Sequence, residues 1–198
     1  MTVAIAPDAN LRPESPSPMR LGIPKEVAHD ERRVATTPDT AKKLRKLGFE
    51  VWVQAGAGLS ASFPDSAYQA AGCQLVEDAA TLWAGVDIVL KVQAPQWHPE
   101  LECSEVDLLS PQGTLISFIW PAQNEALLKQ LAAKGATALA MDAVPRITRA
   151  QKLDALSSMA NLAGYRAVIE AANHFGRGFT GQITAAGKIP PCKVLIIG

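Results

Sequence analysis

The chain has few cysteines and histidines and no long apolar run. Three cysteines (Cys73, Cys103 and Cys192) and three histidines are dispersed over 198 residues, and no C-x-x-C pair occurs. This pattern is typical of reduced thiols and argues against a disulfide framework or a bound metal. A membrane helix needs ~18 apolar residues in succession, and prolines and a glycine interrupt the nearest stretch, 108–124. We therefore expect no metal site and no direct membrane span.

The chain also lacks a surplus of either charge. Nineteen basic residues balance nineteen acidic ones, which argues against nucleic acid as the main partner, because phosphate binding requires excess positive charge. Residues 1–18 lack the basic start and apolar centre of a signal peptide. They are rich in Pro, Ser, Asp and Asn, so we predict a disordered leader and take Met19 as a candidate start.

What the chain does contain is an alternation of apolar runs with helical segments. Strands are predicted at 20–24, 49–53, 74–76, 87–92, 114–120 and 136–141; helices are predicted from Pro38 to Gly48 and at 65–71, 77–84 and 123–134. This alternation predicts an α/β fold with a doubly wound, mostly parallel sheet of the flavodoxin or Rossmann type over residues 19–144.

A loop and a long linking helix follow at 145–190. Thr148 and Gln151 have the spacing of a capping box, so the helix is predicted to begin at Arg149 and to end near His174. Glycine and proline predict loops at 175–179 and 184–191. Residues 191–198 (PCKVLIIG) match the first strand of a dinucleotide-binding Rossmann domain, whose glycine turn would come next. We therefore interpret the chain as a truncated piece of a longer subunit.

The segment 56–61 (GAGLSA) formally matches the G-x-G-x-x-A phosphate-binding pattern after a strand. The pattern requires a helix that begins within the turn, and Phe63-Pro64 interrupts here. A structural turn is the favoured interpretation, and nucleotide binding is the alternative.

The loop and the start of the predicted long helix carry several polar groups. Arg146, Gln151, Asp154 and Ser157 could together hold a polar ligand. They could equally be structural, with Gln151 as a cap, Asp154 compensating the helix dipole and Arg146 paired with Asp154. The spacing alone leaves both interpretations open.

The notable cations outside residues 144–168 are Lys25, Arg32, Arg33 and Lys91. Lys91 ends a predicted strand, where an open parallel sheet usually binds its ligand. With Arg33 from the loop after the first strand, it could clasp a carboxylate. A lysine that simply reaches solvent is the alternative, and the slightly favoured one.

Several segments resemble the alanine dehydrogenase / pyridine nucleotide transhydrogenase family, namely 19–26 (MRLGIPKE), 31–38 (ERRVATTP), 54–58 (QAGAG) and 87–92 (DIVLKV). Residues 145–154 (PRITRAQKLD) and 157–167 (SSMANLAGYRA) are similar to the alpha subunit of the proton-translocating NAD(P) transhydrogenases in particular. The resemblance covers 19–198. It implies that Arg146, Gln151, Asp154 and Ser157 meet the nicotinamide end of NAD(H), and that Arg33 and Lys91 match the keto-acid ligands of alanine dehydrogenases.

The resemblance also separates two enzymatic hypotheses. Alanine dehydrogenases need an acid/base histidine just after the strand that matches residues 115–119, and this chain has Trp120-Pro121 there. Direct hydride transfer between two nicotinamides requires placement but no proton shuttle. We therefore expect part of a transhydrogenase that passes hydride from NADH to NADP+ bound on a partner subunit; the alternative is an NAD-dependent alanine dehydrogenase.

A third hypothesis is a non-catalytic docking or folding unit, because the family's glycine turn is absent from residues 1–198. By itself the chain is then expected to be inactive and to bind NADH weakly or not at all. The transhydrogenase hypothesis implies as partners the rest of the alpha subunit, a beta subunit and a membrane domain. It also implies a homodimer and a cytoplasmic, peripheral location on the inner face of the membrane.

Overall fold

The computed structural model describes residues 17–197, so most of the predicted leader lies outside the described residues. The chain divides into two units, Met1–Ala143 and Val144–Gly198. Each is described by itself.

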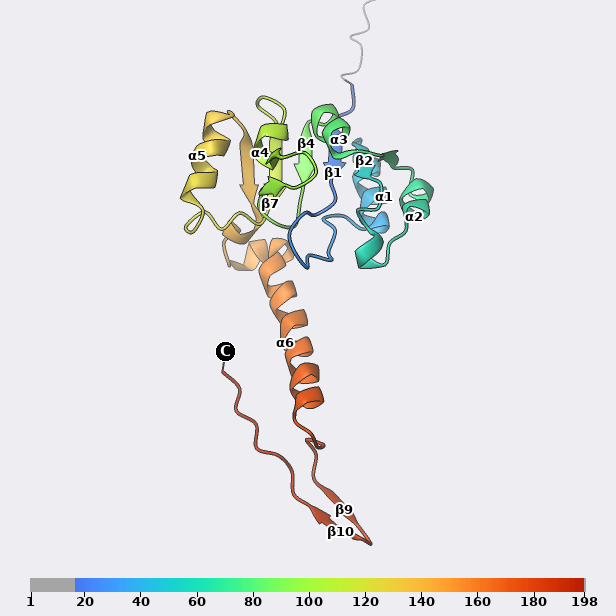
Figure 1. Ribbon diagram of the computed structural model, residues 1–198, viewed down its shortest axis with the longest axis vertical. Coiled ribbons are helices and arrows are strands. Elements are labelled where there is room, and N and C mark those ends of the chain that lie inside the picture. Colours follow the sequence, from blue (N-terminus) through green and yellow to red (C-terminus); the bar gives the residue numbers. More distant parts are fainter. Residues whose placement is uncertain (1–16, 198) are drawn as a thin grey trace, which may run out of the picture. The chain divides into compact units, whose positions relative to one another are not determined.

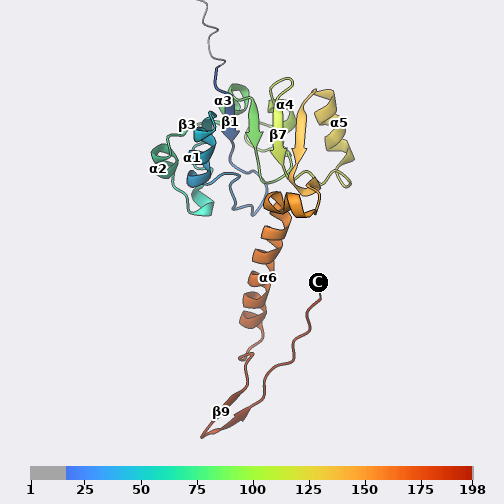
Figure 2. The same ribbon diagram turned by 180° about the vertical axis from the view of Figure 1, so that it is seen from behind.

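The first unit is built on a six-stranded parallel sheet (Figures 1 and 2). Its order is β3-β2-β1-β4-β7-β8, and every neighbouring pair is parallel. The strands are β1 (Arg20–Ile23), β2 (Glu50–Gln54), β3 (Gln74–Val76), β4 (Ile88–Leu90), β7 (Thr114–Ser117) and β8 (Thr137–Ala140). All six were predicted from sequence, and the α/β fold class is confirmed.

Helices connect these strands, and α1, α3 and α4 begin at side-chain caps. They are α1 (Pro38–Lys46), α2 (Asp65–Ala70), α3 (Ala79–Gly85), α4 (Glu105–Leu108) and α5 (Glu125–Ala133), with short 3-10 turns η1 (Leu59–Ala61) and η2 (Met141–Ala143). The Thr37 hydroxyl accepts from the Thr40 amide at the start of α1, and Asp78 does the same for Thr81 in α3. Gly48 follows α1 with φ +98°, a conformation that favours glycine.

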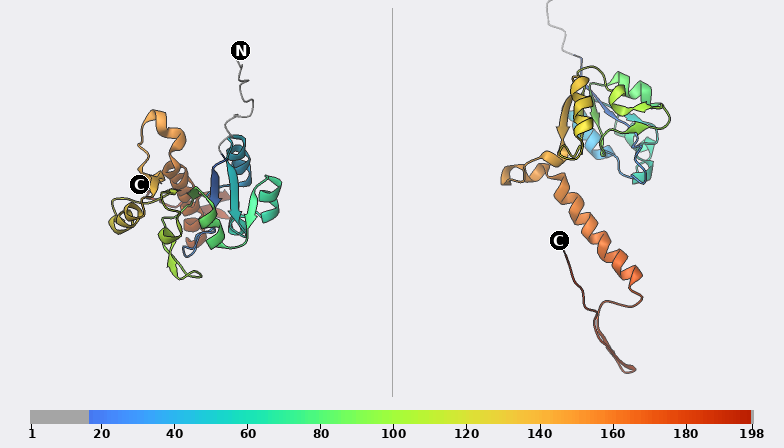
Figure 3. Two further views of the ribbon diagram at one scale, coloured as in Figure 1. Left: turned by 90° about the horizontal axis from the view of Figure 1, so that it is seen from above. Right: turned by 60° about the vertical axis from the view of Figure 1, so that its left-hand side comes forward.

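Helices lie on both faces of the sheet (Figure 3), and each face has its own core. Alternate residues of one strand enter the two cores, as the pleat requires. In β1, Leu21 and Ile23 pack on the side of α1 and α2, whereas Gly22 faces α3. A Cβ at Gly22 would lie 2.7 Å from Val86, so glycine permits the close approach of this helix.

The segment between β4 and β7 contains elements that the sequence did not predict. Strands β5 (Trp97–His98) and β6 (Cys103–Ser104) form an antiparallel hairpin, and α4 follows directly. Two-residue strands are too short to show a period. The Ser104 hydroxyl accepts from the Val106 amide, and this cap starts α4.

The second unit contains η3 (Thr148–Leu153), α6 (Ala155–His174) and an antiparallel hairpin of β9 (Gln182–Thr184) and β10 (Gly187–Ile189). The predicted helix start at Arg149 is wrong: residues 148–153 form 3-10 turns, and α6 starts at Ala155. Asp154 is the cap, because its carboxylate accepts from the Ser157 amide, whereas Ile147, which precedes η3, provides no side-chain cap. The predicted end near His174 is confirmed.

Two further predictions for this unit are corrected. The segment 184–191 was predicted as loop, yet its first part forms the turn and second strand of the hairpin. The strand predicted at 193–198 is not formed at 193–197, because no described segment pairs with it. No helix within the described residues is long and apolar enough to cross a membrane.

Candidate functional site

The strand order reverses between β1 and β4, since the chain continues from β1 to β2 on one side and β4 pairs on the other. In open parallel sheets, ligands bind beyond the C-terminal ends of the strands at such a reversal. Two segments meet there: residues 24–33 after β1 and residues 91–96 after β4.

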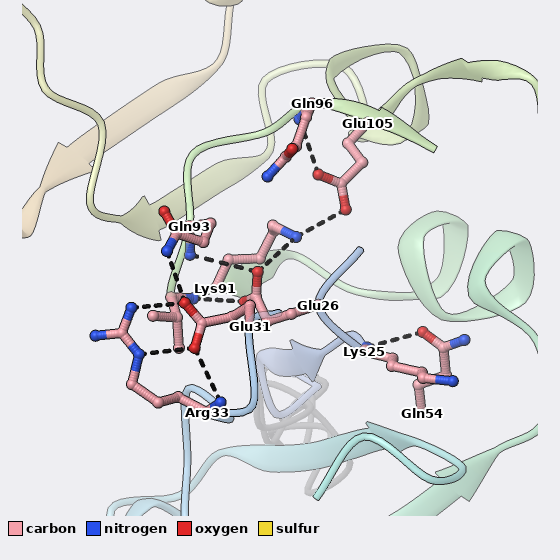
Figure 4. Close-up of polar contacts among 10 residues, drawn as sticks. Lys25, Glu26, Glu31, Arg33, Gln54, Lys91, Gln93, Gln96 and Glu105 are labelled. Carbon is pink, nitrogen blue, oxygen red and sulfur yellow. Dashed lines mark hydrogen bonds and ion pairs between the residues drawn. The ribbon is translucent and has the colours of Figure 1, made fainter. Parts of the chain in front are cut away.

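Lys91 lies at the centre of this region and is fully buried. Its ammonium nitrogen lies 3.2 Å from Glu26 Oε2 and 2.8 Å from Glu105 Oε1, and both carboxylates are buried with it (Figure 4). The favoured interpretation, a lysine that reaches solvent, is wrong. The two carboxylates pair with the Lys91 ammonium. Burying this ammonium without them would cost far more free energy than burying it paired.

The same carboxylates also hold the chain after β4. Glu26 accepts from the Val92 amide at 2.6 Å and from the Gln93 amide at 3.3 Å, and Glu105 accepts from the Gln96 amide at 2.9 Å. Burial raises the pKa of Glu26, an effect larger than the opposing attraction of Lys91 and of these amides. Two carboxylates thus face one ammonium, and desolvation makes the second negative charge costly.

Arg33 lies in the adjoining cluster. Its Nε and Nη2 donate to Glu31 at 2.7 and 2.6 Å, and Gln93 Nε2 donates to the same carboxylate at 2.6 Å. These donors, with Arg33 as the main one, lower the pKa of Glu31 to about 2. Gln93 connects the two clusters, because its backbone amide donates to Glu26 and its side chain donates to Glu31. The two predicted cations, Arg33 and Lys91, therefore lie at the same edge of the sheet (Figure 4). Their binding of an external carboxylate stays a prediction.

A cavity of about 190 Å³ adjoins this cluster; it is lined by Lys25, Glu26, Val27, Gln54, His98, Pro99 and Glu100. The Lys25 amide donates to the Gln54 side chain at 2.9 Å, and buried His98 accepts from the Leu101 amide through Nδ1. Sequence reasoning found the cations here but missed the carboxylates and His98. Within residues 17–197, no group of three or more metal-binding side chains gathers.

The G-x-G-x-x-A segment is a structural turn in this fold. The Gly56 amide, which a phosphate would need, donates instead to both carboxylate oxygens of Asp65 at 2.9 and 3.1 Å. A Cβ at Gly58 would lie 2.6 Å from the Phe63 carbonyl and from the Tyr68 ring, so this glycine permits tight packing. The favoured interpretation of this motif is supported.

The second unit holds the other predicted site residues. Asp154 Oδ1 accepts from the Ser157 amide at 2.9 Å, and the Ser157 hydroxyl donates to Oδ2 at 2.6 Å. Ser157, more than any other group, lowers the pKa of Asp154, and Arg146 contributes attraction without a hydrogen bond. Within residues 17–197, the side chains of Arg146 and Gln151 are exposed and form no hydrogen bond. The structure thus pairs two of the four residues and leaves two with unused donors.

Comparison with known proteins matches residues 22–163 to the alanine dehydrogenase/PNT N-terminal domain, and residues 167–198 to the corresponding C-terminal domain. The chain belongs to the alanine dehydrogenase/PNT family. The resemblance found in the sequence is therefore confirmed.

Within the family, transhydrogenases are the more similar relatives. The NAD(P) transhydrogenase subunit alpha of Cereibacter sphaeroides is 57% identical over 180 residues, covering 91% of this chain and 33% of the relative. The crystal structure of transhydrogenase from Sinorhizobium meliloti has a TM-score of 0.79 and 40% identity, covering 87% of this chain and 49% of that one. The alanine dehydrogenase of Halomonas elongata is 35% identical, covering 91% of this chain and 47% of the relative. The chain thus spans between a third and about half the length of these proteins.

Proposed function

We propose that the chain is the NAD(H)-binding part of an NAD(P) transhydrogenase alpha subunit. The observation that carries the proposal is the 57% identity to the Cereibacter sphaeroides subunit over 91% of the chain, against 35% to an alanine dehydrogenase. The reaction is direct hydride transfer between NAD(H) and NADP(H), which needs the two reacting carbons held about 3–3.5 Å apart and no acid or base.

The geometry of the second unit supports roles for its four polar residues. Arg146 and Gln151 have exposed side chains with unused donors and can bind and orient the nicotinamide end of the cofactor. Asp154 and Ser157 are held in place at the start of α6 by two hydrogen bonds from Ser157 to the Asp154 carboxylate. They can bind the carboxamide or the ribose of the cofactor. The cofactor supplies the hydride, while the chain supplies binding and placement.

The proposal includes partners and a location. The rest of the alpha subunit completes the cofactor site, a beta subunit binds NADP(H), and a membrane domain couples the reaction to proton translocation. The subunit forms a homodimer and lies on the cytoplasmic face of the membrane, held there by its partners. The similar proteins of Cereibacter sphaeroides and Haemophilus influenzae are each a subunit alpha of NAD(P) transhydrogenase, which supports a multi-subunit enzyme.

An alanine dehydrogenase activity is the second candidate. The observation in its favour is that Arg33 and Lys91 lie at one edge of the sheet and are linked through Gln93. Turnover of alanine with NAD by the full-length protein would establish it and remove the first proposal.

The test is hydride transfer from NADH to an NADP+ analogue, measured with the full-length subunit and its partner. Arg146→Ala and Gln151→Asn are expected to lower kcat/KM by about 10-fold or more, since a hydrogen bond to a charged group contributes about 1.5–3 kcal/mol. Arg149→Ala is the matched control, because Arg149 is an exposed neighbour without an assigned contact. Unchanged rates in both variants would remove the roles assigned to Arg146 and Gln151.

A further inference from the structure

The cavity of about 190 Å³ in the first unit lies at the C-terminal edge of the sheet, where open parallel sheets bind ligands. Three segments supply its wall, since Lys25 follows β1, Gln54 ends β2 and His98 lies on β5 after β4. Arg33 and Lys91, the cations predicted to clasp a keto acid, do not line it. The cavity is therefore distinct from that predicted site.

His98 is 3% exposed, and one nitrogen of its ring is unused. Nδ1 accepts from the Leu101 amide at 3.3 Å, and a nitrogen that accepts carries no proton, so this bond assigns the ring proton to Nε2. Nε2 donates to no acceptor within residues 17–197. Unlike the unpartnered Nε1 of Trp83, this nitrogen is not sealed inside the protein, so it can be reached from the cavity that His98 lines.

Gln54 and Lys25 add further unused donors to the same wall. Gln54 is 8% exposed, and its Oε1 accepts from the Lys25 amide at 2.9 Å (Figure 4), so its Nε2 is left as a donor. Within the described part of the chain, neither Gln54 Nε2 nor the Lys25 ammonium has a hydrogen-bond or ion-pair partner. An imidazole, an amide and an ammonium thus surround one cavity with donors to spare.

The acceptors of the wall are largely committed elsewhere. Glu26 Oε1 accepts from the Val92 amide, and Oε2 accepts from the Gln93 amide and pairs with Lys91. The other carboxylate of the wall, Glu100, is exposed. The buried part of the wall therefore offers donors, and a ligand that accepts hydrogen bonds suits it better than a cation.

We propose that this cavity binds a small oxyanion, a carboxylate or a phosphate, through Lys25, Gln54 and His98. Most buried donors in folded proteins have a partner, and one oxyanion supplies several acceptors at once. Hydrogen bonds to a charged acceptor are also the stronger ones. The volume of about 190 Å³ is below the ~300–1,000 Å³ of pockets for drug-sized ligands, so only a small anion fits. The site takes no part in hydride transfer and does not depend on the function proposed above.

The test titrates the 198-residue chain, labelled with ¹⁵N-histidine and free of nucleotide, with sodium acetate and separately with sodium phosphate. Sodium chloride holds the ionic strength constant. A saturable shift of the His98 Nε2 resonance is expected, because that N–H gains an acceptor. A shift with acetate alone identifies a carboxylate site, one with phosphate alone a phosphate site, and one with both a general oxyanion site. The absence of a saturable shift with either anion would overturn the inference.

Three variants assign the binding to the cavity. Lys25→Met is expected to weaken it by about 5- to 10-fold, because a charged donor is lost. Gln54→Glu keeps the oxygen that accepts from the Lys25 amide but replaces the donor with a negative charge, so saturable binding should disappear. Glu100→Gln removes a negative charge beside the cavity and is expected to tighten binding by about 2- to 3-fold.

Lys46→Met is the matched control, because Lys46 is exposed on α1, does not line the cavity and loses the same charge. It is expected to leave binding unchanged. Equal weakening by Lys25→Met and Lys46→Met would indicate general attraction of anions and would overturn the inference. If Gln54→Glu does not fold, the opposite effects expected of Lys25→Met and Glu100→Gln, both at exposed side chains, still decide the question.

Discussion

Helix α3 of the first unit buries Leu82 and Trp83 almost completely, whereas the 20 residues of α6 in the second unit include no buried residue. The first unit is therefore stabilised by removing apolar surface from water on both faces of its sheet. In the second, order depends on main-chain hydrogen bonds and on the Asp154 cap, and Leu162, Tyr165 and Val168 remain exposed. One chain thus combines a unit with its own core and a unit that presents apolar surface.

The buried ion cluster provides the strongest test of this comparison. Lys91→Met removes the ammonium and leaves Glu26 and Glu105 buried without a cation, so we expect a loss of about 3–5 kcal/mol in the free energy of unfolding. Lys42→Met is the matched control, because its ion pair with Asp39 is exposed and contributes at most about 1 kcal/mol. Urea denaturation measures both. Similar small losses would show that the first unit does not depend on its interior cluster.

Two leucine truncations compare the units directly. Leu82→Ala, at 0% exposure, is expected to lower the free energy of unfolding by about 2–5 kcal/mol. Leu162→Ala, at 58% exposure on α6, is expected to change it by no more than about 0.5 kcal/mol. Thermal and urea unfolding of the chain give both values. A large effect at Leu162 would break the comparison, since it would mean that α6 is packed against a partner.

The two units are also expected to differ in how acid affects their stability, and this difference is smaller than those in the two preceding predictions. The pKa of Glu31 is about 2 in the folded state, against an ordinary value of 4.5. Its stabilisation is therefore present above pH 4.5 and is lost as the pH falls from 4.5 toward about 2. The melting temperature of the first unit should therefore fall over this pH range, and Glu31→Gln should make that fall less steep. Asp154→Asn keeps the helix cap, removes a carboxyl whose pKa is also lowered, and should leave the transition of the first unit unchanged. An unaltered decline in Glu31→Gln would assign the acid sensitivity to another group.

Much of the first unit was predictable because strands such as β1 and β2 are largely buried and helices α1 and α3 start at strong caps, Thr37 and Asp78. The hairpin of β5 and β6 was not, since two residues show no period. The start of α6 was misplaced because Thr148 and Asp154 are both good caps in sequence. Only the structure shows that Ser157 donates twice to Asp154.

The candidate site was predictable only in part, because some of its residues meet only in the folded sheet. Lys91 stands out as a cation at a strand end and Arg33 as one in the loop after β1, but no local spacing connects Lys91 with Glu26. The two meet because β1 and β4 are neighbours in the sheet. Trp120 was recognised as a replacement for a proton donor, whereas its positive φ and its support from Asp142 are properties of the folded chain.

The position of β1 in the middle of the sheet has a consequence for synthesis. Its amide at Arg20 donates to Asp87, 67 positions later, whereas its other neighbour, β2, follows soon after it. On the ribosome, the nascent chain can therefore pair β1 with β2 long before β4 emerges from the exit tunnel. Until then the inner edge of β1 stays open, and we expect the newly made protein to need shielding by a chaperone during that interval.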